Sequence, residues 1–418
     1  MELPLPIKED ASVTAGPAES AWLRTAKVAA LLAGVVIVCS GLLAGFAYLL
    51  VSLLASTRMG SSTVALITMA FSILALSLVV GGSLIFQAVG ALTRRPSSVI
   101  RTPSPILFSL AFLAVILWGT LLSLSSSQMK LLSPVPYVLG IALPVIWVLA
   151  VVGNRLVRRG VFVTWRETVL QLSSGAFVAI ALALLLEMLA LIAMILVALL
   201  IVAVMPGGAA TLRHWAAVLQ TPGWADNSNN LRNVILHPSV VLGIYLTVAL
   251  VIPLIEELLK ALGVVLMSYR HPSPAQALWW GILGGAGFAL TEGLLNTNLA
   301  AGDVSWVTIV PLRFGTTILH CCTGGLMGLG WYALITYRRW QDGGKSYIQA
   351  VGLHALWNAV AVSLAFASVS LSPQAPDALP LTPLSAVLTA FLVLQAAVML
   401  FIILRLVARQ TAQIERPA

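Results

Sequence analysis

Ten apolar segments, each long enough to cross a lipid bilayer, constrain the fold of this chain more than any other feature. About 20 helical residues span the hydrocarbon core, where backbone polar groups must be satisfied within the segment. Charged residues make up only 9% of the chain, against roughly 25% in soluble domains. We therefore predict an all-α fold, a polytopic membrane helix bundle of about ten transmembrane helices. The expected spans are 28–55, 63–92, 105–125, 135–153, 173–205, 239–267, 276–299, 308–336, 346–371 and 384–407.

The basic residues predict how this bundle is oriented. If the N-terminus is inside, 17 Lys and Arg fall in inside segments and 4 in outside segments. Cytoplasmic loops of membrane proteins carry such an excess of Lys and Arg. Both termini are therefore expected in the cytoplasm. The net charge of +9 follows from these loops, and it does not indicate a nucleic-acid partner.

The spans divide the chain into five predicted regions. One outside segment is long and holds two Trp residues and an NSNN tract, and it is either a place where part of a substrate is received or a connector at the membrane interface. The regions are a cytoplasmic tail (1–26), an N-terminal membrane region of about five helices (27–205), an extracytoplasmic loop (206–238), a four-helix membrane core (239–371), and a final helix with a cytoplasmic tail (372–418).

The four-helix core holds nearly all the charge that lies inside spans. An ionisable side chain at membrane depth costs at least ~2.5–3.5 kcal/mol on insertion scales, so such residues are expected to have partners and a function. The four helices carry, in order, the patterns Glu256-Glu257-x-x-Lys260, Phe288-x-x-x-Glu292, a mid-helix His320 with Gly328, and His354-x-x-x-Asn358. All of them lie in the middle zone of their spans, and we expect them to converge.

These residue types are suited to the activation of water. Carboxylates and imidazoles can deprotonate a water molecule directly, or they can bind Zn²⁺ or another divalent metal that lowers its pKa to ~7. Asn358 is expected to stabilise a developing oxyanion, and Lys260 to keep one neighbouring glutamate ionised. Arg313 is expected to pair with Glu292 or Asp303, or to reach the outer interface.

The flanking residues favour close packing. Gly281-x-x-x-Gly285 and Gly324-x-x-x-Gly328 are small-xxx-small patterns that let helix backbones approach. Pro253 lacks an N–H and should distort the helix before Glu256, either to admit water to a cavity or for packing alone.

Two further features are less informative. Cys321 and Cys322 are interpreted as packing residues rather than ligands. Glu187 is the lone acid of the fifth span. We interpret it as a residue that is protonated or hydrogen-bonded to a neighbouring helix, rather than as a catalytic residue.

Taken together, the ordered motifs resemble those of the PrsW family of intramembrane peptidases, which is distantly related to the CAAX-protease and bacteriocin-immunity membrane proteins. The match rests on the four patterns above, with Trp357 beside Asn358, and it covers about residues 239–371. One departure is Asn296, where an aromatic residue is expected.

The resemblance implies cleavage of a membrane-anchored protein, such as an anti-sigma-factor-like protein, in a bacterial-type cytoplasmic (inner) membrane. It implies a catalytic role for Glu256 or Glu257 as base, with Glu292, His320, His354 and Asn358 assisting. Lys260, Phe288 and Arg313 would support them. The expected metal ligands are His320, His354 and Glu292, although a metal-free mechanism remains open.

Two other functions are considered for the same cluster. A transporter or proton relay would use the glutamates and histidines to move protons or a cation, and internal repeats, which we do not find, would favour it. A non-catalytic scaffold would not need its Glu, His and Asn positions intact. Other hydrolase motifs do not occur: there is no HExxH and no GxSxG, and all five Asp residues lie outside the spans.

Overall fold

The computed structural model describes residues 21–55, 61–126, 128–161, 163–224, 227–296, 306–371 and 382–412. Within these ranges, ten helical stretches are long and apolar enough to span a membrane. The described residues contain no strand beyond an isolated bridge between Val99 and Thr164. The predicted all-α bundle and its ten spans are confirmed.

Several spans are built from more than one helical piece. Short π-helical turns, which widen the helix, interrupt the second, fifth and sixth spans. In order, the spans are α1 (Ala21–Ala55); α2 (Ser61–Leu76), η2 (Ser77–Gly81) and α3 (Gly82–Leu92); α4 (Pro105–Ser123); α5 (Pro134–Arg158), preceded by η3 (Met129–Leu132); α6 (Trp165–Ser173), η4 (Ser174–Ala179) and α7 (Ile180–Val204); α10 (Pro238–Ile244), η5 (Tyr245–Val251), α11 (Ile252–Lys260) and α12 (Leu262–Leu266), followed by η6 (Ser268–Arg270); α13 (Pro274–Asn296); α14 (Trp306–Tyr337); α15 (Trp340–Leu371); and α16 (Pro383–Ala412).

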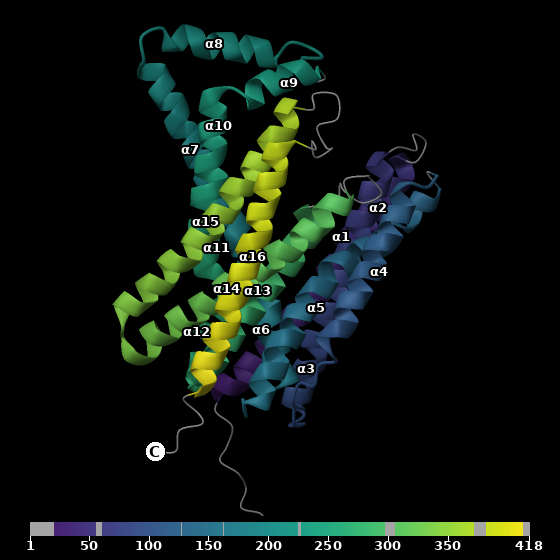
Figure 1. Ribbon diagram of the computed structural model, residues 1–418, viewed down its shortest axis with the longest axis vertical. Helices are drawn as coiled ribbons and strands as arrows, with labels where there is room; N and C mark the ends of the chain where they lie inside the picture. Colours follow the sequence, from purple (N-terminus) through teal and green to yellow (C-terminus); the bar gives the residue numbers. More distant parts are fainter. Residues whose placement is uncertain are drawn as a thin grey trace, which may run out of the picture.

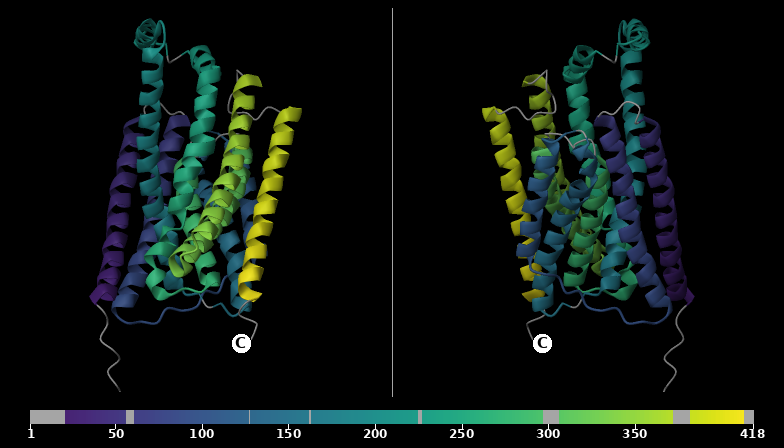
Figure 2. Two further views of the ribbon diagram at one scale, coloured as in Figure 1. Left: turned by 90° about the vertical axis from the view of Figure 1, so that its left-hand side faces the viewer. Right: turned by 90° about the vertical axis from the view of Figure 1, so that its right-hand side faces the viewer.

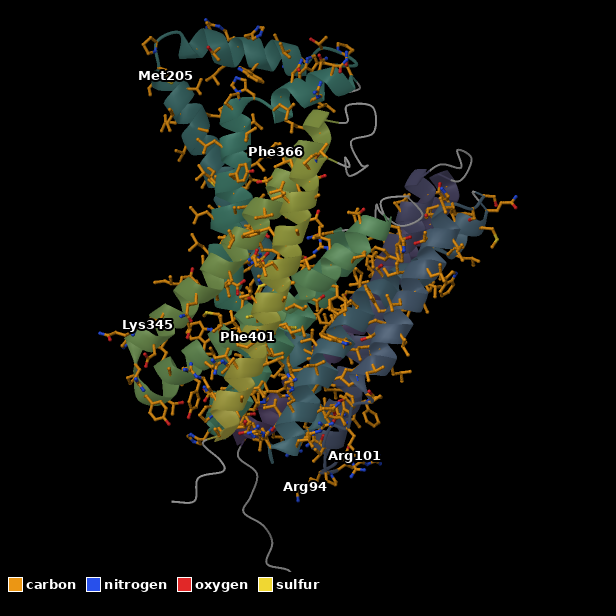
Figure 3. The ribbon with its side chains drawn as sticks, viewed as in Figure 1. Arg94, Arg101, Met205, Lys345, Phe366 and Phe401 are labelled. Carbon is orange, nitrogen blue, oxygen red and sulfur yellow. The ribbon has the colours of Figure 1, made fainter. Side chains whose placement is uncertain are left out.

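The two ends of the described chain lie at the same end of the bundle. α1 begins and α16 ends there (Figure 2), as an even number of crossings requires. Arg94 and Arg101 lie at this end and Met205 at the opposite one (Figure 3). The assignment of this end to the cytoplasm stays a prediction.

The predicted outside loop contains two short helices. α8 (Gly208–Leu219) and α9 (Ser228–Ile235) lie at the end of the bundle opposite the chain ends (Figure 1). Their position is that of helices at a membrane interface, and whether they receive substrate stays a prediction.

α13 is the central helix. It packs against α14 more closely than any other pair of elements, and most of its length is buried. The predicted glycine contacts account for this: a Cβ at Gly281 would lie 2.2 Å from the carbonyl oxygen of Gly324, and one at Gly285 would lie 1.9 Å from that of His320. Only glycine permits backbones to approach this closely.

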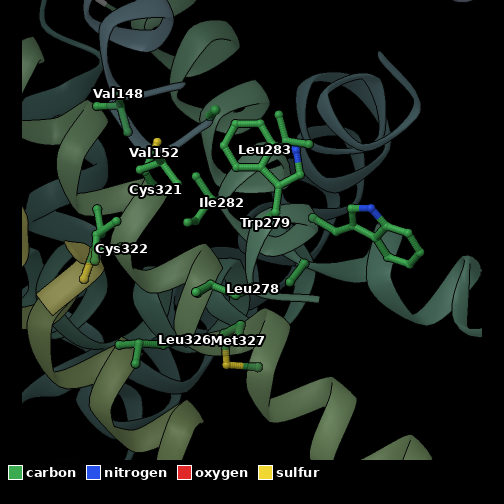
Figure 4. Close-up of a cluster of buried hydrophobic side chains, with 14 of the residues drawn as sticks. Val148, Val152, Leu278, Trp279, Ile282, Leu283, Cys321, Cys322, Leu326 and Met327 are labelled. Carbon is green, nitrogen blue, oxygen red and sulfur yellow. The ribbon is translucent and has the colours of Figure 1, made fainter. Parts of the chain in front are cut away.

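The apolar core lies on one side of this helix pair. Trp279, Leu283 and Leu326 pack there with residues of α5 such as Val148 (Figure 4). A further glycine approach on α13 holds α11: a Cβ at Gly284 would lie 2.2 Å from the carbonyl oxygen of Lys260. α13 therefore fixes the positions of both α14 and α11.

Candidate functional site

The sixth span changes its winding just before the paired glutamates. The π-helical turns of η5 end at Val251, and α11 starts with Pro253 in its first turn. Proline has no N–H, so a carbonyl of the preceding wide turn loses its donor. Asn358 Nδ2 donates to the carbonyl oxygen of Val248 at 2.9 Å, five residues before Pro253. The Val248 carbonyl is therefore satisfied from α15.

α11 presents Glu256, Glu257 and Lys260 to α15. Lys260 is fully buried, and its Nζ lies 2.6 Å from Glu257 Oε1 and 3.0 Å from Glu256 Oε2. The predicted pairing of Lys260 with the glutamates is confirmed. His354 Nδ1 lies 2.6 Å from the same Glu257 oxygen and 3.2 Å from Lys260 Nζ. A buried carboxylate is thereby held by a cation and an imidazole.

A second pair of the same kind joins α13 to α14. His320 Nε2 lies 2.7 Å from Glu292 Oε2, and Arg313 donates to Glu292 Oε1 at 3.0 Å. Of the three alternatives for Arg313, the structure shows the pairing with Glu292. Asp303 lies outside the described residues.

The two pairs meet in the middle of the bundle. The rings of His320 and His354 are 5.3 Å apart and perpendicular. Phe288 separates the pairs on the α13 side: Lys260 Nζ lies 4.8 Å from the centre of its ring, and the His320 ring lies 5.4 Å away. The predicted convergence of the four motifs is confirmed.

Three hydrogen bonds tie α15 to the sixth span around this cluster. Besides the bond from Asn358, Tyr347 donates from its hydroxyl to the carbonyl oxygen of Leu254 at 2.8 Å, and the hydroxyls of Tyr245 and Ser363 lie 2.6 Å apart. Sequence reasoning missed the two tyrosines, because a tyrosine in a membrane helix carries no motif that distinguishes it from an interface residue.

Comparison with known proteins identifies the family. The family model described as PrsW family intramembrane metalloprotease matches residues 164–402, more than half of the chain. The chain belongs to the PrsW family. It is a multi-pass membrane protein of an intramembrane protease family, and the family supports a hydrolase of the protease class. No curated protein and no solved structure matches the chain.

The matched range is wider than the 239–371 region on which the sequence resemblance rests. It begins at the fifth span and includes most of the tenth. The relationship to the CAAX-protease and bacteriocin-immunity proteins stays a prediction.

In this PrsW family chain, four buried side chains have the chemistry of a metal site. Glu256, Glu257, His320 and His354 each offer one ligand atom, and these atoms lie within 4.8 Å of one another. Three buried polar atoms of this set have no hydrogen-bond partner in the described chain: Glu256 Oε2, which has only its ion pair with Lys260, Glu257 Oε2 and His320 Nδ1. Two carboxylates and two imidazoles match the oxygen and nitrogen donors that Zn²⁺ accepts. The donor set therefore fits a divalent metal.

Other residues considered from the sequence fall around this cluster. Glu187 on α7 is half-buried, and α7 packs on α11, so a fifth helix brings a carboxylate towards Glu256. Cys321 and Cys322 belong to the apolar cluster, where both are fully buried (Figure 4). Asn296, the departure from the family pattern, is the last residue of α13 and is exposed.

Proposed function

We propose that this protein hydrolyses a peptide bond of a membrane-anchored substrate at the cluster formed by α11, α13, α14 and α15. The observation that carries the proposal is the set of four buried donors within 4.8 Å of one another, inside candidate membrane spans of a PrsW family chain. Buried ionisable groups of this number are costly in a membrane, and a hydrolytic centre gives them a function.

Glu256 is the general base of the proposed reaction. Glu257 is fully buried, and its Oε1 serves both Lys260 and His354. Glu256 is 7% exposed, lies 3.8 Å from the ring nitrogen of His354, and pairs with Lys260 through one oxygen. A general base must contact the attacking water and accept its proton. Glu256 is more exposed than Glu257 and has fewer partners, so it can do this more readily.

The other two acids orient the histidines. When Glu257 accepts a hydrogen bond from His354 Nδ1–H, the Nε2 lone pair of that ring is free. When Glu292 accepts from His320 Nε2–H, Nδ1 is free, and this is the buried atom without a hydrogen-bond partner. Carboxylates fix the tautomer of metal-binding histidines in this way. Both oxygens of Glu292 are engaged, so its predicted role as a ligand has less support than orientation of His320.

A divalent metal would be held by His320 and His354, which leaves Glu256 as the base, and it would lower the pKa of water and polarise the scissile carbonyl. Water then loses a proton to Glu256 and attacks the carbonyl carbon, and Glu256 returns that proton to the leaving nitrogen. Lys260 offsets one of the two negative charges when both glutamates are ionised.

The predicted oxyanion role of Asn358 stays a prediction. One amide hydrogen is used on the Val248 carbonyl, and an amide has a second. Positioning of α15 is the role that its contacts support.

The substrate is proposed to approach from the side of Glu292 and Arg313. Their side chains are 20% and 16% exposed, whereas those of Glu257 and Lys260 are fully enclosed. A peptide that reaches such a site must itself lie in or beside the membrane. A single-span, anti-sigma-factor-like protein in a bacterial-type inner membrane is the class expected.

The proposal is tested by comparing new protein N-termini in membranes that contain the wild type or the variants Glu256→Gln and Glu257→Gln. The matched control is Asp342→Asn, an exposed carboxylate paired with Arg339 at 2.6 Å on the surface. New termini in or near single-span segments should appear with the wild type and the control only. Loss of a catalytic base is expected to lower cleavage at least ~100-fold.

Identical profiles from folded wild type and Glu256→Gln would contradict the peptidase. Ion or proton flux in vesicles would then test the transporter or proton relay, and its absence would leave the non-catalytic scaffold. Metal content per chain is measured in parallel. It should fall in His320→Ala and His354→Ala, while His214→Ala and His237→Ala, two histidines of the outer segment, should leave it unchanged.

A further inference from the structure

A groove remote from the polar cluster opens at the end of the bundle where α1 begins and α16 ends. It has a volume of about 710 Å³ and is lined by α1, α3, the junction of α6 with η4, and the segment from α12 to η6. Figure 1 shows α3, α6 and α12 together at this end. The volume lies in the range of ~300–1,000 Å³ typical of small-molecule sites.

The charged side chains that line the groove are basic: Lys27, Arg166 and Arg270 line it, and no carboxylate belongs to its lining among the described residues. Arg166 donates to the carbonyl oxygen of Arg95 through Nη2, and its buried Nε has no hydrogen-bond partner in the described chain. Among the described residues, Arg270 forms a long ion pair, 3.8 Å, with Glu167. Arg166 and Arg270 therefore keep hydrogen-bonding capacity beside an otherwise apolar groove, and this favours an anionic ligand.

Two neutral polar groups lie buried in the same lining. Gln171 is 1% exposed; its Nε2 donates to the carbonyl oxygen of Gly263, and its Oε1 has no hydrogen-bond partner among the described residues. The buried hydroxyl of Ser174 likewise has no hydrogen-bond partner among the described residues. A carbonyl-type oxygen needs a donor, which a phosphate ester does not provide and a hydroxyl does. These groups therefore favour a ligand that carries hydroxyls as well as a negative charge.

The rest of the lining is apolar, as expected of a site that holds acyl chains. Leu170, Leu266 and Met267 form an apolar wall, and alanines of α1 and α3 leave the space open. Trp22 and Tyr269 stand at the same end, and such aromatic residues are enriched at the level of lipid headgroups. The labelled Arg94 and Arg101 also lie at this end (Figure 3).

We propose that this groove binds one anionic phospholipid with a polyol headgroup, of the phosphatidylglycerol class. The phosphate lies among Lys27, Arg166 and Arg270, the headgroup hydroxyls bond Gln171 and Ser174, and the acyl chains follow the wall between α1 and α12. This site is separate from the hydrolytic cluster, and it does not depend on the proposed function.

Native mass spectrometry of the full chain from mixed phosphatidylglycerol and phosphatidylcholine tests the site. The wild type should retain one phosphatidylglycerol in preference to phosphatidylcholine. Lys27→Gln/Arg270→Gln should lower that retention roughly tenfold or more, since each cation near an anionic lipid contributes about fivefold. The control Arg155→Gln/Arg158→Gln removes two exposed charges of α5 that do not line the groove, and it should retain the lipid.

A second variant tests the apolar part and keeps every charge. Ala26→Trp fills the groove from α1 and should reduce retention, whereas Leu32→Trp, an exposed apolar position of the same helix, should not. Equal retention of the two lipids by the wild type would overturn the proposal. If inorganic phosphate displaces the lipid, the groove recognises phosphate alone, and the part of the proposal that assigns acyl chains to the apolar wall would be overturned. A wild type that retains no lipid would also overturn it, and the acidic stretch of residues 1–20 would become the occupant to test.

Discussion

The Glu257–His354 pair and the Glu292–His320 pair are made of the same parts, but they differ in enclosure. Each has a carboxylate, an imidazole within 2.7 Å of it, and a cation from the same helix as one member. Glu257 and its cation Lys260 are fully enclosed, while Glu292 and Arg313 keep 20% and 16% of their side chains exposed. We infer that the enclosed pair fixes the geometry of the site and that the open pair faces the substrate.

The two pairs are also held by different forces. α15 is tied to the sixth span by hydrogen bonds from Tyr347 and Asn358 to backbone carbonyls. α13 and α14 are held by glycine contacts, in which no side chain intervenes. Hydrogen bonds set one distance each, whereas close backbone packing sets the whole crossing of two helices. Each half of the site can therefore be disturbed separately.

Removal of the enclosed cation should have the largest effect on stability. Lys260→Met leaves Glu256 and Glu257 buried without their partner, and breaking a buried ion pair from one side costs ~3–5 kcal/mol. Arg313→Met, its counterpart in the open pair, should cost about 1 kcal/mol or less, because water can reach Glu292.

Reversible unfolding of the detergent-solubilised protein measures both variants. Equal losses of unfolding free energy would show that the two pairs do not differ in enclosure. An additional Glu257→Gln in the Lys260→Met background should recover part of the loss, since it removes the orphaned charge.

Gly285→Ala should disturb the open pair through its backbone. The new methyl group would lie 1.9 Å from the carbonyl oxygen of His320, so α13 and α14 must separate. Forced overpacking of this kind costs ~1–3 kcal/mol, and cleavage should fall because His320 moves. The control is Gly352→Ala on α15, where a Cβ meets nothing within 4 Å, and it should be neutral or stabilising by up to ~1 kcal/mol. Similar unfolding midpoints for the two variants would refute the glycine contact.

Glu292→Gln should weaken metal binding without abolishing it. The amide can no longer fix His320 as the carboxylate does, and loss of such an orienting partner typically costs 10–100-fold in metal affinity, that is about 1.4–2.7 kcal/mol. Competition with a chelator measures the affinity directly, apart from catalysis. A loss as complete as that of His320→Ala would mean that Glu292 is itself a ligand, as the sequence predicted.

The sequence predicted the ten spans and the four helices of the site because insertion into a bilayer depends on local composition. It also predicted that the charged motifs converge, since each buried charge needs a partner. It did not predict which carboxylate pairs with which histidine. Glu257 and Glu256 are adjacent in sequence, and only the packing of α15 on α11 decides that Glu257 contacts His354 at 2.6 Å.

Helix rotation limited the sequence analysis in other places as well. The position of Glu187 beside Glu256 depends on how α7 is turned, which an almost uniformly apolar helix does not reveal. The bond from Asn358 to Val248 depends on the π-helical turns of η5. Such turns arise from packing across helices and have no pattern in sequence.

The smallest predicted effect is a coupling between Asn358 and Pro253, and it tests the support of the enclosed pair. Asn358→Ala leaves the buried carbonyl of Val248 without a donor, at a cost of ~1–3 kcal/mol. Pro253→Ala restores an N–H five residues after that carbonyl, where a π-helical bond can form. In the Pro253→Ala background, the Asn358→Ala substitution should therefore cost less, by about 1 kcal/mol.

The double-mutant cycle is measured by unfolding, and cleavage by the four proteins is measured beside it. If Asn358 acts mainly through Val248, activity should recover together with stability in the double variant. If the double variant is stable but inactive, the second amide hydrogen of Asn358 contacts the reacting groups, and the oxyanion role predicted from the sequence is supported. Additive costs would mean that Pro253 and Asn358 act on separate parts of the bundle, and the enclosed pair would then owe its geometry to Tyr347 and to packing alone.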